Sequence, residues 1–193
     1  RGSYLMSTGS ATAWNMPNGL NFLYTVPMFH CNGWCYPWTL AMLHARVICI
    51  RNIRAKEIFD LIIEHKVTHF GGAPIILNML ASAPKEEQKP LKHKVYVLTA
   101  AAPPPSIIFK KMKNLGFEVM HVYGLTETYG HILQCAWNKE WDDLNEDEKA
   151  EISARQGVRY PNLEAVDVMD PETMKSVPRD GKTIGEIMIR GNV

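Results

Sequence analysis

Strand-like apolar runs alternate with helical segments from residue 21 to residue 123, and this alternation constrains the fold more than any other feature. Such a pattern favours parallel strands joined by helices. After residue 141 it changes to a charged helix at 144–155 and two strands near 165–169 and 184–190. We therefore predict an α/β fold with a mainly parallel sheet flanked by helices (βαβ units) and an antiparallel C-terminal appendage. The expected strands are 21–28, 46–50, 67–70, 95–98 and 117–122, and the expected helices are 34–44, 55–66, 74–82 and 105–115.

For two of these strands we also predict burial or the point where the strand ends. The run 46–50 is interpreted as a short buried strand, and Gly71-Gly72 is expected to end the strand 67–70. The lysine-rich stretch 83–93 is interpreted as a polar loop between a helix and the next strand.

Composition excludes several classes of protein. The 193 residues are 46% hydrophobic and 21% charged, which is ordinary for a globular domain. The net charge is +1, and the lysines and arginines are scattered, so the sequence does not indicate a basic patch that would bind nucleic acid. No apolar run approaches the roughly 18–20 residues of a membrane span.

The four cysteines form no Cys-x-x-Cys pair. We expect free and mostly buried thiols in a reducing compartment. A zinc site could recruit His30, Cys31 and Cys35, but two adjacent ligands followed by a three-residue gap fit no common structural-zinc spacing.

The stretch Tyr123-Gly124-Leu125-Thr126-Glu127-Thr128 directly follows an apolar strand. Ligands of open α/β sheets bind where strands end. The Thr126 hydroxyl suits a phosphate oxygen, and the Glu127 carboxylate suits Mg²⁺. The motif therefore indicates a nucleotide and magnesium site; the alternative is a turn whose polar residues satisfy only the backbone.

Four ordered segments carry a resemblance to a known family. Residues 123–127 resemble the Tyr-Gly-x-Thr-Glu signature of the AMP-forming adenylating superfamily, and residues 26–33 resemble its Leu-Pro-x-Phe-His-x-x-Gly segment. Residues 99–104 resemble its small-residue loop, and residues 156–161, 164–165 and 185–187 resemble the segments that close its large domain. The sequence of residues 30–34 and 71–74 is most similar to that of plant acyl-activating enzymes.

The resemblance implies ATP or AMP, Mg²⁺ and coenzyme A as cofactors or co-substrates. Thr126, Glu127 and His30 are the implied catalytic residues, with Glu127 as the metal ligand. Alanine at Ala100, where the family usually has glycine, and histidine at His121, where it often has an amide, are departures. The implied nucleotide-binding residues are Ala100, Ala101, Ala102, Pro103, His121, Tyr123, Gly124, Thr126, Gln156 and Gly157.

The resemblance also places a carboxylic acid beside His30, which would act as a gate at the mouth of the acyl tunnel. Arg51 matches a region that can meet the CoA nucleotide, although an arginine after a strand is usually only solvated. The implied substrate-binding residues are His30, Asn32, Gly33, Trp34, Gly72, Ala73 and Arg51.

Several parts of the family pattern are absent from residues 1–193: the phosphate loop with its lysine, the Thr-Gly-Asp segment, and the small domain with the catalytic lysine. We expect a partial adenylation domain that is inactive alone and is completed by N-terminal and C-terminal parts of the same enzyme. The implied activity is an acid–thiol ligase acting on a fatty or aryl acid. Alternatives are an adenylation domain that loads a carrier-protein thiol and a non-catalytic nucleotide-binding or interaction module. We expect an intracellular protein, cytoplasmic or peroxisomal.

Overall fold

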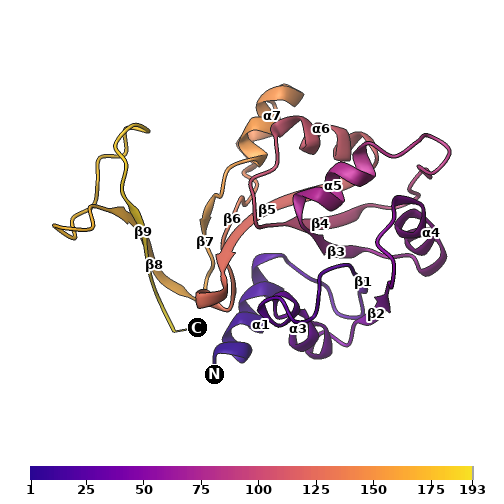
Figure 1. Cartoon of the computed structure of the whole chain (residues 1–193), viewed down its shortest axis with the longest axis horizontal. Coiled ribbons are helices and arrows are strands. Elements are labelled where there is room, and N and C mark those ends of the chain that lie inside the picture. The colour runs from indigo at the N-terminus through magenta and orange to yellow at the C-terminus, as the bar shows by residue number, and fades with distance from the viewer. Residues whose placement is uncertain (193) are drawn as a thin grey trace.

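A seven-stranded sheet forms the centre of the protein (Figure 1). The computed structural model describes residues 1–192. The strand order is β2-β1-β3-β4-β5-β6-β7; the first five strands run parallel, and β6 and β7 pair antiparallel. The predicted mainly parallel sheet is therefore confirmed. The strands are β1 (Asn21–Tyr24), β2 (Arg46–Cys49), β3 (His69–Gly72), β4 (Val95–Thr99), β5 (Phe117–Leu125), β6 (Gly130–Gln134) and β7 (Val158–Arg159).

Helices cover both faces of this sheet (Figure 1). One face packs against α4 (Ala55–His65), α5 (Pro74–Ala81) and α6 (Ser106–Asn114), through a core that includes Phe70 and Phe117. The other face packs against α3 (Tyr36–Met42) and the end of α1 (Gly2–Ala13). Each fully buried side chain of this size contributes roughly 1.5–3 kcal/mol by leaving water.

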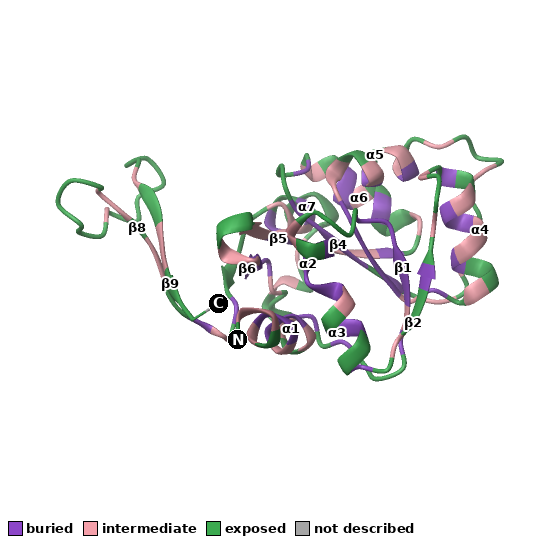
Figure 2. Ribbon diagram, turned by 60° about the horizontal axis from the view of Figure 1, so that its bottom comes forward, coloured by how far each residue is buried: buried purple, intermediate pink, exposed green. Residues whose placement is uncertain are grey.

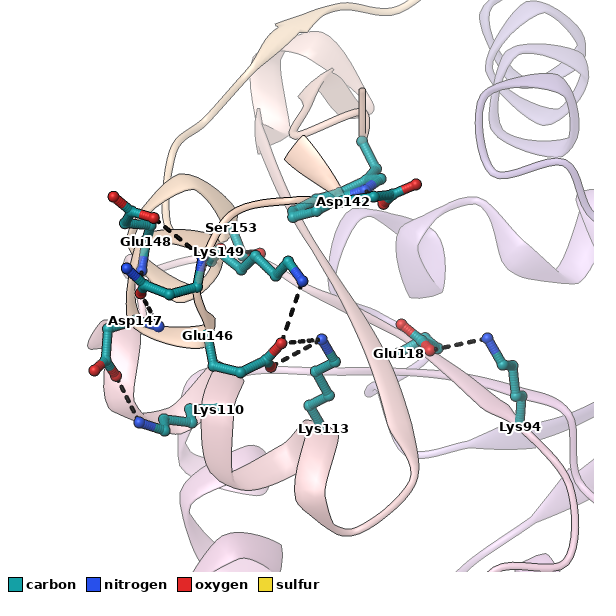
Figure 3. Close-up of polar contacts among 12 residues, drawn as sticks. Lys94, Lys110, Lys113, Glu118, Asp142, Glu146, Asp147, Glu148, Lys149 and Ser153 are labelled. Carbon is teal, nitrogen blue, oxygen red and sulfur yellow. Dashed lines mark hydrogen bonds and ion pairs between the residues drawn. The ribbon is translucent and has the colours of Figure 1, made fainter. Parts of the chain in front are cut away.

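The short helix α7 (Glu146–Ser153) lies beside α6, and ion pairs join the two (Figure 3). Lys110 Nζ lies 2.6 Å from Asp147 Oδ1, and Lys113 Nζ lies 2.9 Å from Glu146 Oε2. These pairs are largely exposed, so they add little to stability and mainly orient α7.

An antiparallel hairpin of β8 (Leu163–Met169) and β9 (Glu186–Gly191) extends away from the main sheet (Figure 1). Most of its residues are exposed or half-buried (Figure 2). The predicted antiparallel appendage is thus confirmed. Among the helices of residues 1–192, none is long and apolar enough to cross a membrane.

Three strand predictions were wrong in detail. Strand β2 is not buried, because it lies at the sheet edge and only Ile48 of its four residues is buried. Gly71 and Gly72 do not stop the strand at Phe70 but are the last two residues of β3, where they pair with Leu98 and Thr99. Strand β5 continues through Tyr123 and Gly124 to Leu125, since β6 supplies a partner for this half of the strand.

One predicted helix differs in the structure, and three elements are missing from the sequence-based prediction. The expected helix 34–44 is divided into α2 (Cys31–Trp34), which has left-handed backbone, and α3, which starts at Tyr36. Helix α1 and strands β6 and β7 were not predicted. All four cysteines are free, but only Cys35 and Cys135 are buried; Cys49 is exposed because it lies on the edge strand β2.

Candidate active site

Most of the predicted site residues follow the carboxyl ends of neighbouring parallel strands. His30 comes after β1, Ala73 after β3, Ala100 after β4 and Thr126 after β5. The sheet order places β1, β3, β4 and β5 side by side. These segments therefore share one edge of the sheet, which is the usual ligand-binding edge of an open α/β sheet.

A single turn of 3-10 helix, Thr126–Thr128, follows β5 and presents the Thr126 and Glu127 side chains to solvent. The backbone N–H of Leu125 donates to Thr128 Oγ1 at 3.0 Å, and this hydroxyl lies 2.9 Å from the Gly130 carbonyl oxygen. Tyr129 N–H donates to Thr126 O at 3.0 Å. Thr128 thus shapes the turn, and Thr126 and Glu127 stay available to a ligand.

The segment after His30 forms a left-handed turn. From Cys31 to Cys35 the φ angles are 42°, 44°, 62°, 56° and 63°. Left-handed backbone costs roughly 1–2 kcal/mol for each residue other than glycine. The Tyr24 hydroxyl donates to Gly33 O at 2.9 Å, and a Cβ at Gly33 would lie 2.0 Å from the same hydroxyl oxygen. Only glycine therefore fits this position.

The left-handed turn and the Thr126 turn are in contact. Cys31 Sγ lies 3.5 Å from Thr126 Oγ1, and Asn32 Nδ2 donates to the Tyr129 hydroxyl at 3.3 Å. The structure therefore brings the predicted acid-binding segment against the predicted phosphate and metal turn. His30 is exposed immediately before the left-handed turn.

Trp34 is buried between β3 and β6. A Cβ at Gly71 would lie 3.0 Å from Trp34 Cζ3, so the indole packs directly on the backbone of β3. Its other neighbour is the His131 ring, at a centroid distance of 4.7 Å. Gly72 is buried at the end of β3, and Ala73 is half-buried and directly precedes α5. Trp34 thus forms a rigid wall beside the sheet edge.

The alanine loop after β4 contains one unusual backbone conformation. Ala100 is buried, whereas Ala101, Ala102 and Pro103 are exposed. Ala101 has a φ of 88°, in the region that favours glycine. Backbone strain of this kind is concentrated at ligand sites. The small side chains leave the backbone of this loop open to close approach by a flat ligand.

His121 is buried and engaged with the chain that follows α7. Its Nδ1 lies 2.9 Å from Ala154 O and 3.1 Å from Arg155 O, so this nitrogen carries the proton and donates. The next two residues, Gln156 and Gly157, are exposed and line a hollow of about 370 Å³. His121 therefore holds this segment in place, and a contact to a nucleotide would have to use its other atoms.

Arg51 is a predicted residue that lies far from the Thr126 turn. It is exposed after β2, which lies four strand positions from β5, or roughly 19 Å at normal strand spacing. Tyr123 and Gly124 lie within β5, half-buried, where Gly124 pairs with His131 across a bulge.

Sequence reasoning missed three side chains that build the site: Tyr24, Tyr129 and His131. Burial lowers the pKa of His131 to about 3, so its imidazole is neutral at physiological pH. Burial also raises the pKa of Tyr24, which remains a hydrogen-bond donor. An aromatic residue two positions after Glu127 was the available signal for Tyr129; the roles of Tyr24 and His131 depend on contacts that the sequence does not display.

A larger hollow of about 760 Å³ lies elsewhere, between the α6–α7 pair and the segment at Trp14. None of the predicted site residues lines it. It is therefore separate from the candidate active site.

These features define an open α/β domain with a candidate ligand site at the carboxyl edge of its parallel strands. The AMP-binding enzyme family model matches residues 3–193, and the chain belongs to this family. It is 52% identical over its whole length to a peroxisomal acetate/butyrate–CoA ligase of Arabidopsis thaliana and to an acetate–CoA ligase of Humulus lupulus. The chain spans about a third of the length of these relatives, 34% in each case.

Solved structures share the fold. The O-succinylbenzoate coenzyme A synthetase of Bacillus subtilis, in complex with ATP and a magnesium ion, superposes with a TM-score of 0.79 at 18% identity, over 98% of this chain and 36% of that one. The N-terminal domain of FACL13 from Mycobacterium tuberculosis superposes with a TM-score of 0.77 at 21% identity, over 98% of this chain and 45% of that one. The expected acyl-CoA synthetase-like fold is thus confirmed.

Proposed function

We propose that the complete protein containing this chain is an acid–thiol ligase of the AMP-forming type. The carboxylate of the acid attacks the α-phosphorus of ATP, the bond to pyrophosphate breaks, and an acyl-adenylate forms. The thiolate of coenzyme A then attacks the acyl carbon, and AMP leaves. The observation that carries the proposal is the contact between Cys31 and Thr126. It joins the left-handed turn Cys31–Cys35, which we propose to be the acid side, to the Thr126–Thr128 turn, which we propose to be the phosphate side.

The donor groups of the phosphate-side turn suit Mg²⁺. Glu127 is an exposed carboxylate with the Thr126 hydroxyl next to it, and Mg²⁺ is usually held by one or two carboxylates together with phosphate oxygens. When bound, the ion would neutralise charge that develops on the phosphates. Glu127 would hold it, and Thr126 would donate a hydrogen bond to a phosphate oxygen.

We further propose that the acid is a short aliphatic one. Trp34 is 5% exposed and packs on Gly71, so the wall behind the acid is bulky and fixed. The names of three relatives, 47–52% identical, specify acetate, acetate or butyrate, and 2-methylpropanoate. For location we keep the cytoplasm or the peroxisome; two relatives carry "peroxisomal" in their names.

The test is acid-dependent pyrophosphate release by the complete protein, with a panel from acetate to long-chain and aryl acids. We expect AMP and pyrophosphate as products, acyl-CoA when coenzyme A is added, and the highest kcat/KM for acids of a few carbons. Products of ADP and orthophosphate would rule out the proposed reaction. If a carrier-protein thiol replaced coenzyme A as the only acceptor, the ligase assignment would give way to carrier loading.

A further inference from the structure

The left-handed turn Cys31–Cys35 needs outside support. Three of its five residues, Cys31, Trp34 and Cys35, are neither glycine nor asparagine, and left-handed backbone is costly for them. Strained conformations persist where surrounding contacts over-determine them. On the interior side the support comes from the Tyr24 hydroxyl at Gly33 O and from Ser7 Oγ, 3.4 Å from Cys35 Sγ.

On the side of the Thr126 turn, the support is centred on Tyr129. Its hydroxyl oxygen accepts from Asn32 Nδ2 at 3.3 Å and from Ser3 Oγ at 3.2 Å. One oxygen therefore joins the left-handed turn to the first turn of α1. The Tyr129 ring is half-buried against the cluster that contains Met6 and Ile132, so its position is fixed by packing.

The backbone of Tyr129 is part of the phosphate-side turn. Its N–H closes this turn by donating to Thr126 O at 3.0 Å, and its φ of 57° is left-handed. Displacement of the ring would therefore move the turn that carries Thr126 and Glu127. The ring and the backbone of one residue thus connect the acid side to the phosphate side.

We propose that Tyr129 is a positioning residue, whose hydroxyl holds the left-handed turn against the Thr126–Thr128 turn so that the carboxylate and the α-phosphate meet in the reactive geometry. This inference depends on the proposed ligase function. In this proposal Tyr129 contacts neither the carboxylate nor the α-phosphate. It acts through Asn32 on one side and Thr126 on the other.

The first test is single-turnover acyl-adenylate formation by the complete protein carrying Tyr129→Phe. The rate should fall about tenfold and the KM for the acid should rise, as expected for the loss of one aligning hydrogen bond, while the KM for ATP changes little. Tyr4→Phe is the matched control, because Tyr4 is 70% exposed. An unchanged rate in Tyr129→Phe, with wild type active, would overturn the inference and leave the ligase function standing.

A double-mutant cycle separates positioning from general damage to the fold. Asn32→Ala removes the other partner of the hydrogen bond and lies on the surface, so it remains informative if Tyr129→Phe folds poorly. The double variant should be no slower than the slower single variant, because both remove the same contact. Multiplicative effects of the two substitutions would contradict the proposal.

Cysteine reactivity gives a readout that does not require ligase activity. Cys31 is half-buried in the left-handed turn, whereas Cys49 is exposed on β2 and serves as an internal standard. Alkylation by iodoacetamide, mapped by mass spectrometry, should become several-fold faster at Cys31 in Tyr129→Phe and stay the same at Cys49. Equal Cys31 rates in the variant and wild type would show that the hydroxyl does not hold the turn, whether or not the protein proves to be a ligase.

Discussion

The indole of Trp34 and the imidazole of His131 meet edge to face, with ring centroids 4.7 Å apart and planes at 79°. Edge-to-face contact is a favourable arrangement of aromatic rings. Because His131 is in β6 and Trp34 also packs on Gly71 in β3, the indole is held between two strands of the sheet. The proposed acid wall is thus fixed by the core and not by a mobile loop.

Gly71→Ala should weaken acid binding. The new Cβ would lie 3.0 Å from Trp34 Cζ3 and 3.3 Å from Val26 Cγ2, so the indole must shift. Overpacking of this kind costs roughly 1–3 kcal/mol, and a loss of that size in acid binding corresponds to a rise of about fivefold or more in the KM for the acid. The KM for ATP should not change. Steady-state kinetics of the complete protein with both substrates varied would measure this.

Val97→Ile is the control for Gly71→Ala. It overpacks the neighbouring strand β4 in the core that contains Phe70, on the face away from the cluster of Trp34. If Val97→Ile raised the KM for the acid as much as Gly71→Ala, the effect would come from general strain in the sheet and not from Trp34.

Glu127→Gln should slow adenylation much more than it weakens acid binding. The substitution keeps the shape of the side chain but removes the charge that would hold Mg²⁺ beside the phosphates. Loss of one preorganised electrostatic group typically costs on the order of 10²-fold in kcat. Rapid-quench measurement of acyl-adenylate formation would test it, with exposed Glu86→Gln as the control. A wild-type rate in Glu127→Gln would leave Glu127 with only a structural role.

The alternation of strands and helices was predictable because each segment carries its own apolar pattern. Helix α1 was not, because its sequence is rich in Ser, Thr and Gly, which are weak helix formers. Its hydroxyls bond to carbonyls one turn back, as Ser7 does to Ser3 O and Thr12 to Thr8 O. The helix is stabilised by burial of Met6 and Ser10 against the rest of the protein, which no local signal reveals.

The candidate site was predictable as a set of segments but not as a geometry. The motif of Thr126 and Glu127 and the segment at His30 were visible in the sequence. The left-handed backbone of residues 31–35 was not, since local propensity favours a right-handed helix there. Its contact with Tyr129 joins residues 97 positions apart in the chain, so it arises only from the packed fold.

Asn145→Ala should loosen α7. The Asn145 side chain accepts from the N–H groups of Asp147 and Glu148, both at 3.0 Å, and the Glu148 carboxylate accepts from Asn145 N–H at 3.0 Å. Loss of such a cap costs about 1 kcal/mol. Hydrogen exchange at Asp147 and Glu148 should become faster, whereas Asn145→Ser should retain protection. Unchanged exchange in Asn145→Ala would show that the ion pairs to α6 hold the helix without its cap.

Lowering the pH from 7.5 to 5.0 should destabilise the protein, with His131 as a main cause. Burial lowers the pKa of His131 to about 3 and that of His69 to about 4, from an ordinary value of 6.5. Between about pH 3–4 and pH 6.5, the unfolded chain binds protons at these two histidines that the folded chain does not. Stability is therefore fully present above about pH 6.5 and is lost progressively as the pH falls toward 3–4.

Thermal unfolding of the complete protein at the two pH values would measure the loss. His131→Leu should reduce the difference in Tm between them, and exposed His44→Asn should not. A His131→Leu protein with the full wild-type loss of Tm would show that the acid sensitivity originates elsewhere.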